Sequence, residues 1–193
     1  MTFQDALVRT CSWIQLSPVQ LTQLERHYDL LYKWNRNLNL TSISSFFEVV
    51  QLHYCESLFI GSVLPRGDLR IVDVGSGAGF PGIPLAIARP ECEVTLVEAH
   101  QRKGVFLREA ARGLENISVI VGRAEKIAGG FDWLVGRGVR PSDLLSLNVA
   151  FHSAIFMTAE ELLRLPKPFQ IVPVPGTRNR VIAQFHVERD KIH

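Results

Sequence analysis

The sequence has few cysteines and lacks any long hydrophobic run. Its three cysteines, Cys11, Cys55 and Cys92, are widely spaced and odd in number. They match neither the paired spacing of a zinc site nor a disulfide framework, so we expect reduced thiols, a cytoplasmic protein and no bound metal. The apolar stretches are short and interrupted by charge, and no basic N-terminal segment precedes an apolar one. We therefore expect neither a membrane span nor a signal peptide.

A strong charge of either sign is also absent, since the formal net charge is +2 over 193 residues. This balance neither requires nor excludes a nucleic-acid partner. Sixteen of the 21 basic residues are arginine, which favours bidentate phosphate contact over a point charge, although a GC-rich genome would produce the same bias. The length and the 47% hydrophobic content predict one globular unit with an appendage.

The first part of the chain has apolar residues at helical spacing. We expect helices over residues 3–15, 17–35 and about 46–63, with Ser17 and Pro18 as a cap and first turn. The asparagine-rich residues 35–41 are expected to end the second helix. Residues 1–64 are therefore predicted to form an N-terminal helical cap.

From Leu69 the pattern changes to alternating strands and helices. Strands are expected at residues 69–74, 93–98, 117–121, 131–135 and 154–157, helices at 84–88, 101–112 and 143–150, and a terminal hairpin at 170–174 and 180–187. This order predicts an α/β fold over residues 65–193, with a mostly parallel, Rossmann-like sheet, helices on both faces and a C-terminal antiparallel hairpin.

A glycine-rich turn follows the first expected strand. It begins at Asp73 and contains Gly75, Gly77 and Gly79, which allow sharp turning and close approach to a ligand at a helix N-terminus. Glu98 ends the next strand, where its carboxylate could accept hydrogen bonds from both ribose hydroxyls. Together these features predict an adenine-nucleoside cofactor site. The alternative is a tight turn without a ligand and a solvated Glu98.

The glycine-rich turn fits two classes of enzyme, nicotinamide-dependent oxidoreductases and methyltransferases, which use different cofactors. Residues 77–82 match the G-x-G-x-x-G pattern of nicotinamide-dependent oxidoreductases. The earlier glycine, Gly75, and the acid two residues before it instead form D-x-G-x-G, the methyltransferase pattern. Arg123, Ala124 and Glu125 follow the third strand, where methyltransferases place residues along the adenine edge.

Several motifs resemble the RsmG family, also called GidB, of bacterial 16S ribosomal RNA guanine methyltransferases. They are Lys33-Trp34-Asn35 with Asn39-Leu40-Thr41, His53 with Glu56-Ser57, the run from Asp73 to Leu85, and Arg137 after the fourth strand. The resemblance covers most of the chain, and the prolines Pro81 and Pro84 make the glycine-rich run nearly diagnostic.

The resemblance implies a class I methyltransferase that uses S-adenosyl-L-methionine to methylate nitrogen 7 of a guanosine. The implied partner is 16S ribosomal RNA or the small ribosomal subunit, and we expect a monomer. The resemblance implies that Arg137, Asn39 and His53 serve catalysis, the latter two near the base, and that Gly75, Phe80, Ala124, Glu125 and Arg137 contact the cofactor. The turn and strand pattern adds further cofactor-binding residues: Asp73, Ser76, Gly77, Gly79 and Glu98.

One departure from the family pattern lies after the fifth strand. Family members carry Leu-Lys-Gly there, whereas this chain has Met157-Thr158-Ala159. Nitrogen 7 of guanine needs no general base, so alignment and electrostatics can carry the reaction, and we expect Thr158 to slow it. The competing hypothesis is a homologue that binds cofactor or ribosome without transferring a methyl group.

Overall fold

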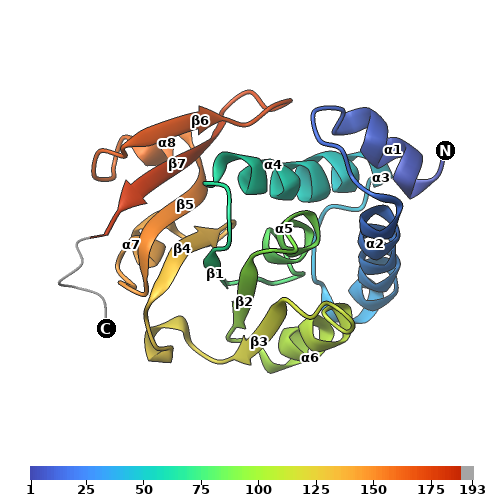
Figure 1. The fold of residues 1–193 in the computed structure, drawn as a ribbon, viewed down its shortest axis with the longest axis horizontal. Helices are drawn as coiled ribbons and strands as arrows, with labels where there is room; N and C mark the ends of the chain where they lie inside the picture. The colour runs from blue at the N-terminus through green and yellow to red at the C-terminus, as the bar shows by residue number, and fades with distance from the viewer. Residues whose placement is uncertain (188–193) are drawn as a thin grey trace.

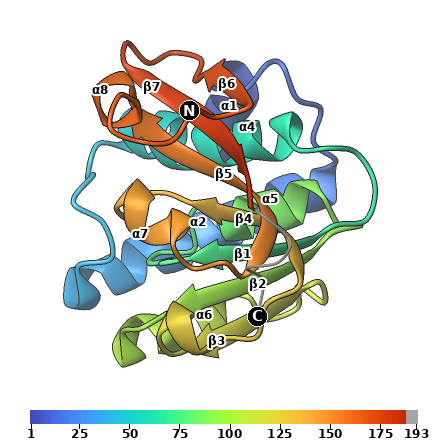
Figure 2. The same ribbon diagram turned by 90° about the vertical axis from the view of Figure 1, so that its left-hand side faces the viewer.

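The computed structural model describes residues 1–187, and these form a central sheet covered by helices on both faces (Figures 1 and 2). The seven strands lie in the order β3-β2-β1-β4-β5-β7-β6. Their bounds are β1 Arg70–Val74, β2 Glu93–Glu98, β3 Ile117–Val121, β4 Phe131–Gly136, β5 Ala150–Thr158, β6 Gln170–Pro173 and β7 Arg180–His186. Strands β1 to β5 pair in parallel, and β7 pairs antiparallel with β5 and β6. The predicted fold class, including the hairpin, is confirmed; the last six residues of the predicted second domain lie outside the described residues.

The helices divide between two apolar cores because successive strand residues point to opposite faces. Ile71 packs into the core shared with the N-terminal helices, α5 (Gly82–Ala88) and α6 (Gln101–Ala110), whereas Val72 packs into the other. Leu144 and Leu162 cover that second face from α7 (Pro141–Leu145) and α8 (Ala159–Leu162). Within residues 1–187, no helix combines the length and apolar character that crossing a bilayer requires.

The N-terminal segment contains α1 (Phe3–Thr10), α2 (Pro18–Leu38), α3 (Phe46–Glu48), the π-helix η1 (Val49–Cys55) and α4 (Glu56–Val63). Two boundaries were predicted wrongly: α1 ends earlier, and α2 continues through the asparagines. Trp34 and Leu38 pack against the core, and this burial outweighs the low helix propensity of asparagine. Asn39 ends α2 with a left-handed backbone, at φ 48°.

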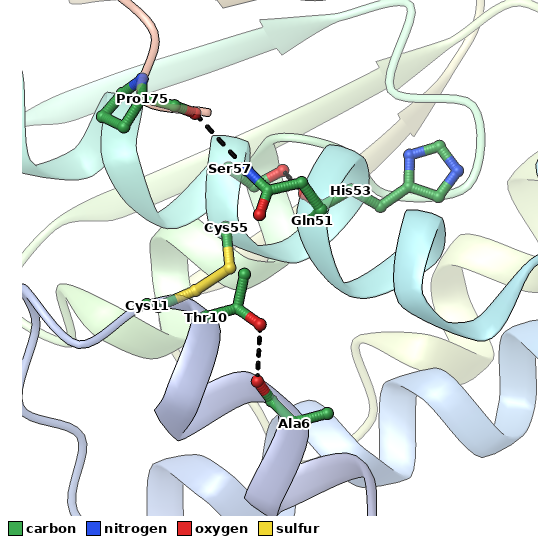
Figure 3. Close-up of a disulfide and its surroundings, with 8 residues drawn as sticks. All are labelled: Ala6, Thr10, Cys11, Gln51, His53, Cys55, Ser57 and Pro175. Carbon is green, nitrogen blue, oxygen red and sulfur yellow. Dashed lines mark hydrogen bonds between the residues drawn. A yellow bond between two sulfur atoms is a disulfide. The ribbon is translucent and has the colours of Figure 1, made fainter. Parts of the chain in front are cut away.

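The prediction of three reduced thiols is wrong for two of them, because Cys11 and Cys55 form a disulfide (Figure 3). They are 44 residues apart in sequence, yet α1 packs against η1 and brings their Cα atoms to 5.7 Å. Sequence spacing does not report such a tertiary approach. Cys92 is a free, buried thiol.

The C-terminal part also differs from the prediction in detail. Helix α7 spans Pro141–Leu145 and not residues 143–150, and β5 begins at Ala150 and not at residue 154. The reason is pairing, since β5 is hydrogen-bonded to β4 on one side and β7 on the other, which holds the whole segment extended. The short helix α8 was not predicted; the Thr158 side chain accepts the Glu161 N–H at its start.

Candidate functional site

The glycine-rich turn connects β1 to α5 and has backbone conformations that favour glycine. Gly75, Gly77 and Gly79 all have positive φ. A Cβ on Gly79 would lie 2.4 Å from Ile83 Cδ1, so a side chain does not fit there. The turn thus packs against its own helix, as the sequence pattern predicts.

Asp73, near the end of β1, holds this turn in place through hydrogen bonds to Ser76 within the turn and to Gly82 at the start of α5. Its Oδ2 accepts the backbone N–H of Gly82 at 2.9 Å, and its backbone carbonyl accepts the Ser76 hydroxyl at 2.9 Å. The side chain is fully buried and Oδ1 has no hydrogen-bond partner in the described residues. Burial raises the pKa of Asp73 to about 7, while the Gly82 hydrogen bond acts in the opposite direction. Asp73 therefore orients the turn and does not line the open cleft.

A cleft of about 740 Å³ lies beside the turn at the carboxyl ends of the parallel strands. Four predicted cofactor residues line it: Gly75, Glu98, Ala124 and Glu125. The Glu98 carboxylate accepts the N–H of Gly77 on Oε2 at 3.0 Å and the N–H of His100 on Oε1 at 2.8 Å. Each oxygen keeps lone-pair capacity for a ligand hydroxyl. Apolar walls come from Val97, Val139, Leu144 and Leu147.

A second cluster surrounds Phe80, the turn residue that follows Gly79, and it lies outside the lining of the cleft. The His53 ring stacks on the Phe80 ring with centroids 4.5 Å apart and planes at 11°. The Arg137 guanidinium lies 5.4 Å from the same ring centroid and donates to His53 Nδ1 and to the Leu52 carbonyl. The structure therefore brings together Phe80, His53 and Arg137, which come from three separate parts of the chain.

These contacts determine the protonation state of His53. A guanidinium can only donate, so Nδ1 must be the unprotonated acceptor, and Nε2–H donates to Thr41 Oγ1 at 2.7 Å. Burial and then the positive charge of Arg137 lower the pKa of His53 to about 3. His53 is thus a neutral, fixed ring at pH 7.

Arg137 is anchored by a carboxylate that the sequence analysis did not assign. Glu56 Oε2 lies 3.2 Å from both Arg137 and Arg180, and the Glu56 side chain is fully buried. Burial raises the pKa of Glu56, and the two arginines act in the opposite direction. The sequence shows Glu56 close after His53 in the same motif, but it does not indicate that Glu56 pairs with Arg180 in β7.

His27 is a second residue that the sequence analysis missed. It is 1% exposed; its Nε2–H donates to the Ala78 carbonyl in the turn at 2.9 Å, and Tyr54 donates to Nδ1 at 2.9 Å. Burial lowers its pKa to about 4. His27 lies on the apolar face of α2 between Leu24 and Leu31. This helical spacing is the sequence feature that could have indicated a buried histidine.

The remaining predicted residues lie around these two clusters. Ser76, Gly77 and Gly79 form the turn itself. Asn39 is exposed at the end of α2, two residues before the Thr41 that hydrogen-bonds His53. Thr158 borders a separate cleft of about 510 Å³ that also reaches Gly138, next to Arg137.

The sequence matches known proteins over most of this region. The family described as "GidB: rRNA small subunit methyltransferase G" matches residues 20–151. The "Ribosomal RNA small subunit methyltransferase G" of Nitrosomonas eutropha is 37% identical over 192 residues, covering 86% of this chain and 88% of that protein. The protein of the same name from Nitrosomonas europaea is 51% identical over 109 residues, 55% of this chain and 50% of that protein. The chain thus aligns with about half the length of the latter.

Solved structures agree on the fold. A SAM dependent methyltransferase from Aquifex aeolicus has a TM-score of 0.56 at 18% identity, covering 72% of this chain and 93% of that one. Aeropyrum pernix fibrillarin, in complex with natively bound S-adenosyl-L-methionine, has a TM-score of 0.53 at 16% identity, covering 66% and 72%. At these identities the likeness concerns the fold alone. The family match over residues 20–151 and the 37% identity to the Nitrosomonas eutropha protein show that this chain belongs to the rRNA small subunit methyltransferase G family.

Proposed function

We propose that this chain transfers a methyl group from S-adenosyl-L-methionine to ribosomal RNA of the small subunit. One observation carries the proposal: the 740 Å³ cleft joins the glycine turn to Glu98 at the carboxyl ends of the strands, where open α/β sheets bind ligands. Family membership favours this reaction over the nicotinamide-dependent alternative.

The residues of the cleft suit the cofactor. Glu98 is fixed by two backbone N–H groups and can still accept from two ribose hydroxyls. Position 75 requires glycine, since a Cβ there would lie 2.4 Å from Val139 Cγ2, and both residues line the cleft. Ala124 and the apolar Leu144 and Leu147 suit the faces of an adenine ring.

The proposed mechanism depends on positioning. When bound, S-adenosyl-L-methionine supplies a methyl group on a positively charged sulfur. Glu98 and the turn hold the nucleoside end, while the buried Phe80 ring, stacked on the neutral His53 ring and next to Arg137, keeps this part of the turn rigid. Because His53 has a pKa of about 3, it is not suited to act as a general base at neutral pH. Alignment of the reacting atoms supplies the rate enhancement.

Nitrogen 7 of guanosine is the proposed acceptor because its lone pair needs no deprotonation, in agreement with the neutral, fixed His53. By the family resemblance, Asn39 and His53 lie near the target base and Arg137 serves both base and cofactor. Because its proposed substrate is the small ribosomal subunit, we place the reaction in the cytoplasm, although the Cys11–Cys55 disulfide removes the argument from reduced thiols. We also propose that the protein is a monomer, which size-exclusion chromatography with light scattering tests.

Calorimetry tests the cofactor site. We expect S-adenosylhomocysteine, and not NAD, to bind in the micromolar range, and Glu98→Ala to weaken binding at least about tenfold through loss of charge-assisted hydrogen bonds. Glu93→Ala is the matched control, because Glu93 is an exposed carboxylate at the opposite end of β2. Unchanged affinity in Glu98→Ala would remove the cofactor-site assignment.

A transfer assay tests the reaction. Small subunits from a strain lacking this gene should gain one methyl group from labelled S-adenosyl-L-methionine, and mass spectrometry should place it on nitrogen 7 of a guanosine in 16S RNA. Cofactor binding without transfer would support the non-catalytic hypothesis, and a methyl group on another atom would refute the nitrogen 7 assignment.

A further inference from the structure

A second groove, of about 240 Å³, lies on the N-terminal helical segment between α2 and residues 41–49. Its walls include Tyr32 and Arg36 from α2 and Thr41 and Ser44 from the loop that follows. None of these residues takes part in the cofactor cleft. The groove combines a ring, a cation and hydroxyl groups in one small space.

Tyr32 exposes 62% of its surface at the edge of this groove. The Arg36 guanidinium lies 5.1 Å from its ring centroid, one helical turn further along α2. Exposed aromatic rings and guanidinium planes are the surfaces on which unpaired RNA bases stack. Among the described residues that line the groove, Arg36 is the charged one, which suits a polyanion.

The wall opposite Tyr32 is held rigidly. The Asn35 side chain donates to the Thr41 carbonyl at 3.0 Å and accepts the Thr41 N–H at 2.9 Å. Thr41 Oγ1 accepts the N–H of Ile43 at 3.1 Å and that of His53 at 2.7 Å. Because both donors point at this oxygen, the Thr41 hydroxyl proton remains available for a further acceptor.

The same Thr41 connects the groove to the candidate site. Its neighbour His53 stacks on Phe80 of the glycine-rich turn, so one contact chain runs from the groove to the Phe80 cluster. Thr41 therefore lines the groove and contacts the candidate site through the same hydroxyl oxygen.

We propose that this groove is a nucleobase subsite, in which an unpaired nucleotide next to the methylated one stacks on Tyr32 beside Arg36. The inference deepens the proposed function, on which it rests. A second protein could also dock on an exposed tyrosine, but the cation, the hydroxyl groups and the continuity with His53 favour RNA.

Filter binding of unmodified small subunits tests the subsite. Tyr32→Ala should weaken binding about 5- to 140-fold, equivalent to about 1 to 3 kcal/mol of stacking at 1.4 kcal/mol per factor of ten. Tyr32→Phe keeps the ring and should stay within about twofold of the wild type. Phe169→Ala removes another exposed aromatic ring, in the segment before β6, and should have no effect. Arg36→Ala should weaken binding and reduce its salt dependence.

Two further readouts separate the possible outcomes. S-adenosylhomocysteine affinity should stay unchanged in all variants, and ultraviolet cross-linking should attach a nucleotide to the Tyr32 peptide. If the wild type methylates subunits while Tyr32→Ala binds them equally well, the subsite is refuted and the function stands. If the wild type transfers no methyl group but Tyr32→Ala still loses RNA binding, the proposed function fails, and the groove stands as an RNA-binding subsite without a methylated neighbour. If Tyr32→Ala fails to fold, Arg36→Ala and the cross-link decide, and absence of both effects refutes the subsite.

Discussion

Reduction of the Cys11–Cys55 disulfide should lower the stability of the protein by a large, measurable amount. The bond closes a loop across a sequence separation of 44 residues. For a loop of about 45 residues, the chain-entropy relation gives about 13 cal/mol/K of lost unfolded-state entropy, or about 4 kcal/mol at 25 °C. With a urea m-value of about 2 kcal/mol/M, the unfolding midpoint should fall by about 2 M.

The assay is urea unfolding monitored by circular dichroism, with and without a dithiol reductant. Cys11→Ser should unfold at the same midpoint as the reduced wild type, because both lack the cross-link. Cys92→Ser is the control: Cys92 is a free thiol, so this variant should retain the full difference between oxidised and reduced protein. Thiol titration of the unfolded, unreduced wild type should count one thiol, and three after reduction.

Two results would refute this reasoning. Three reactive thiols in the unreduced protein would mean that the bond does not form in solution. One reactive thiol with equal midpoints in both redox states would mean that the cross-link forms but that strain or residual unfolded-state structure cancels the entropic gain.

Three further predictions concern the candidate site and its supports. Glu56→Gln should lower the unfolding free energy by about 3 kcal/mol and slow methyl transfer, because it leaves the Arg137 cation without its buried partner. Chemical denaturation would measure the stability and a single-turnover assay the transfer rate. A wild-type stability together with a wild-type rate would contradict the prediction. Thr158→Lys should raise transfer or leave it unchanged, at a cost of about 1 kcal/mol from the lost α8 cap; slower transfer in single-turnover assays would show that Thr158 is not a defect. Acid should destabilise the fold through His27, because burial lowers its pKa from the ordinary 6.5 to about 4 in the folded protein. The stability that depends on neutral His27 is fully present above pH 6.5, and about 3 kcal/mol of unfolding free energy is lost as the pH falls to 4. In urea titrations across this range, His27→Gln should show a correspondingly smaller pH dependence, and an equal dependence would show that His27 does not titrate as described.

Local sequence pattern predicted the elements that form the sheet. Strands such as β1 and β2 are short apolar runs bounded by turn signals, and their order along the chain is sufficient for a parallel sheet. The glycine turn was predictable for a similar reason, since its positive φ angles depend on residues adjacent in sequence. The same holds for Glu98, because a strand end next to the turn must lie at the same sheet edge.

Tertiary packing decided the features that join distant segments. The Asn-rich end of α2 stays helical because Leu38 gains burial, and β5 starts early because it has two neighbours to pair with. Local propensities are worth tenths of a kcal/mol per residue, and burial of a large apolar side chain is worth more.

The pairings of individual side chains were likewise beyond the sequence. Glu56 contacts Arg180 across 124 positions of the chain, His27 reaches the turn at Ala78, and Cys11 meets Cys55. Each contact depends on where a helix packs against the sheet, which no local pattern encodes. The sequence by itself therefore determined the sheet, the turn and the family motifs, whereas the tertiary structure decided which side chains hold them together, because those partners meet only after the chain has folded.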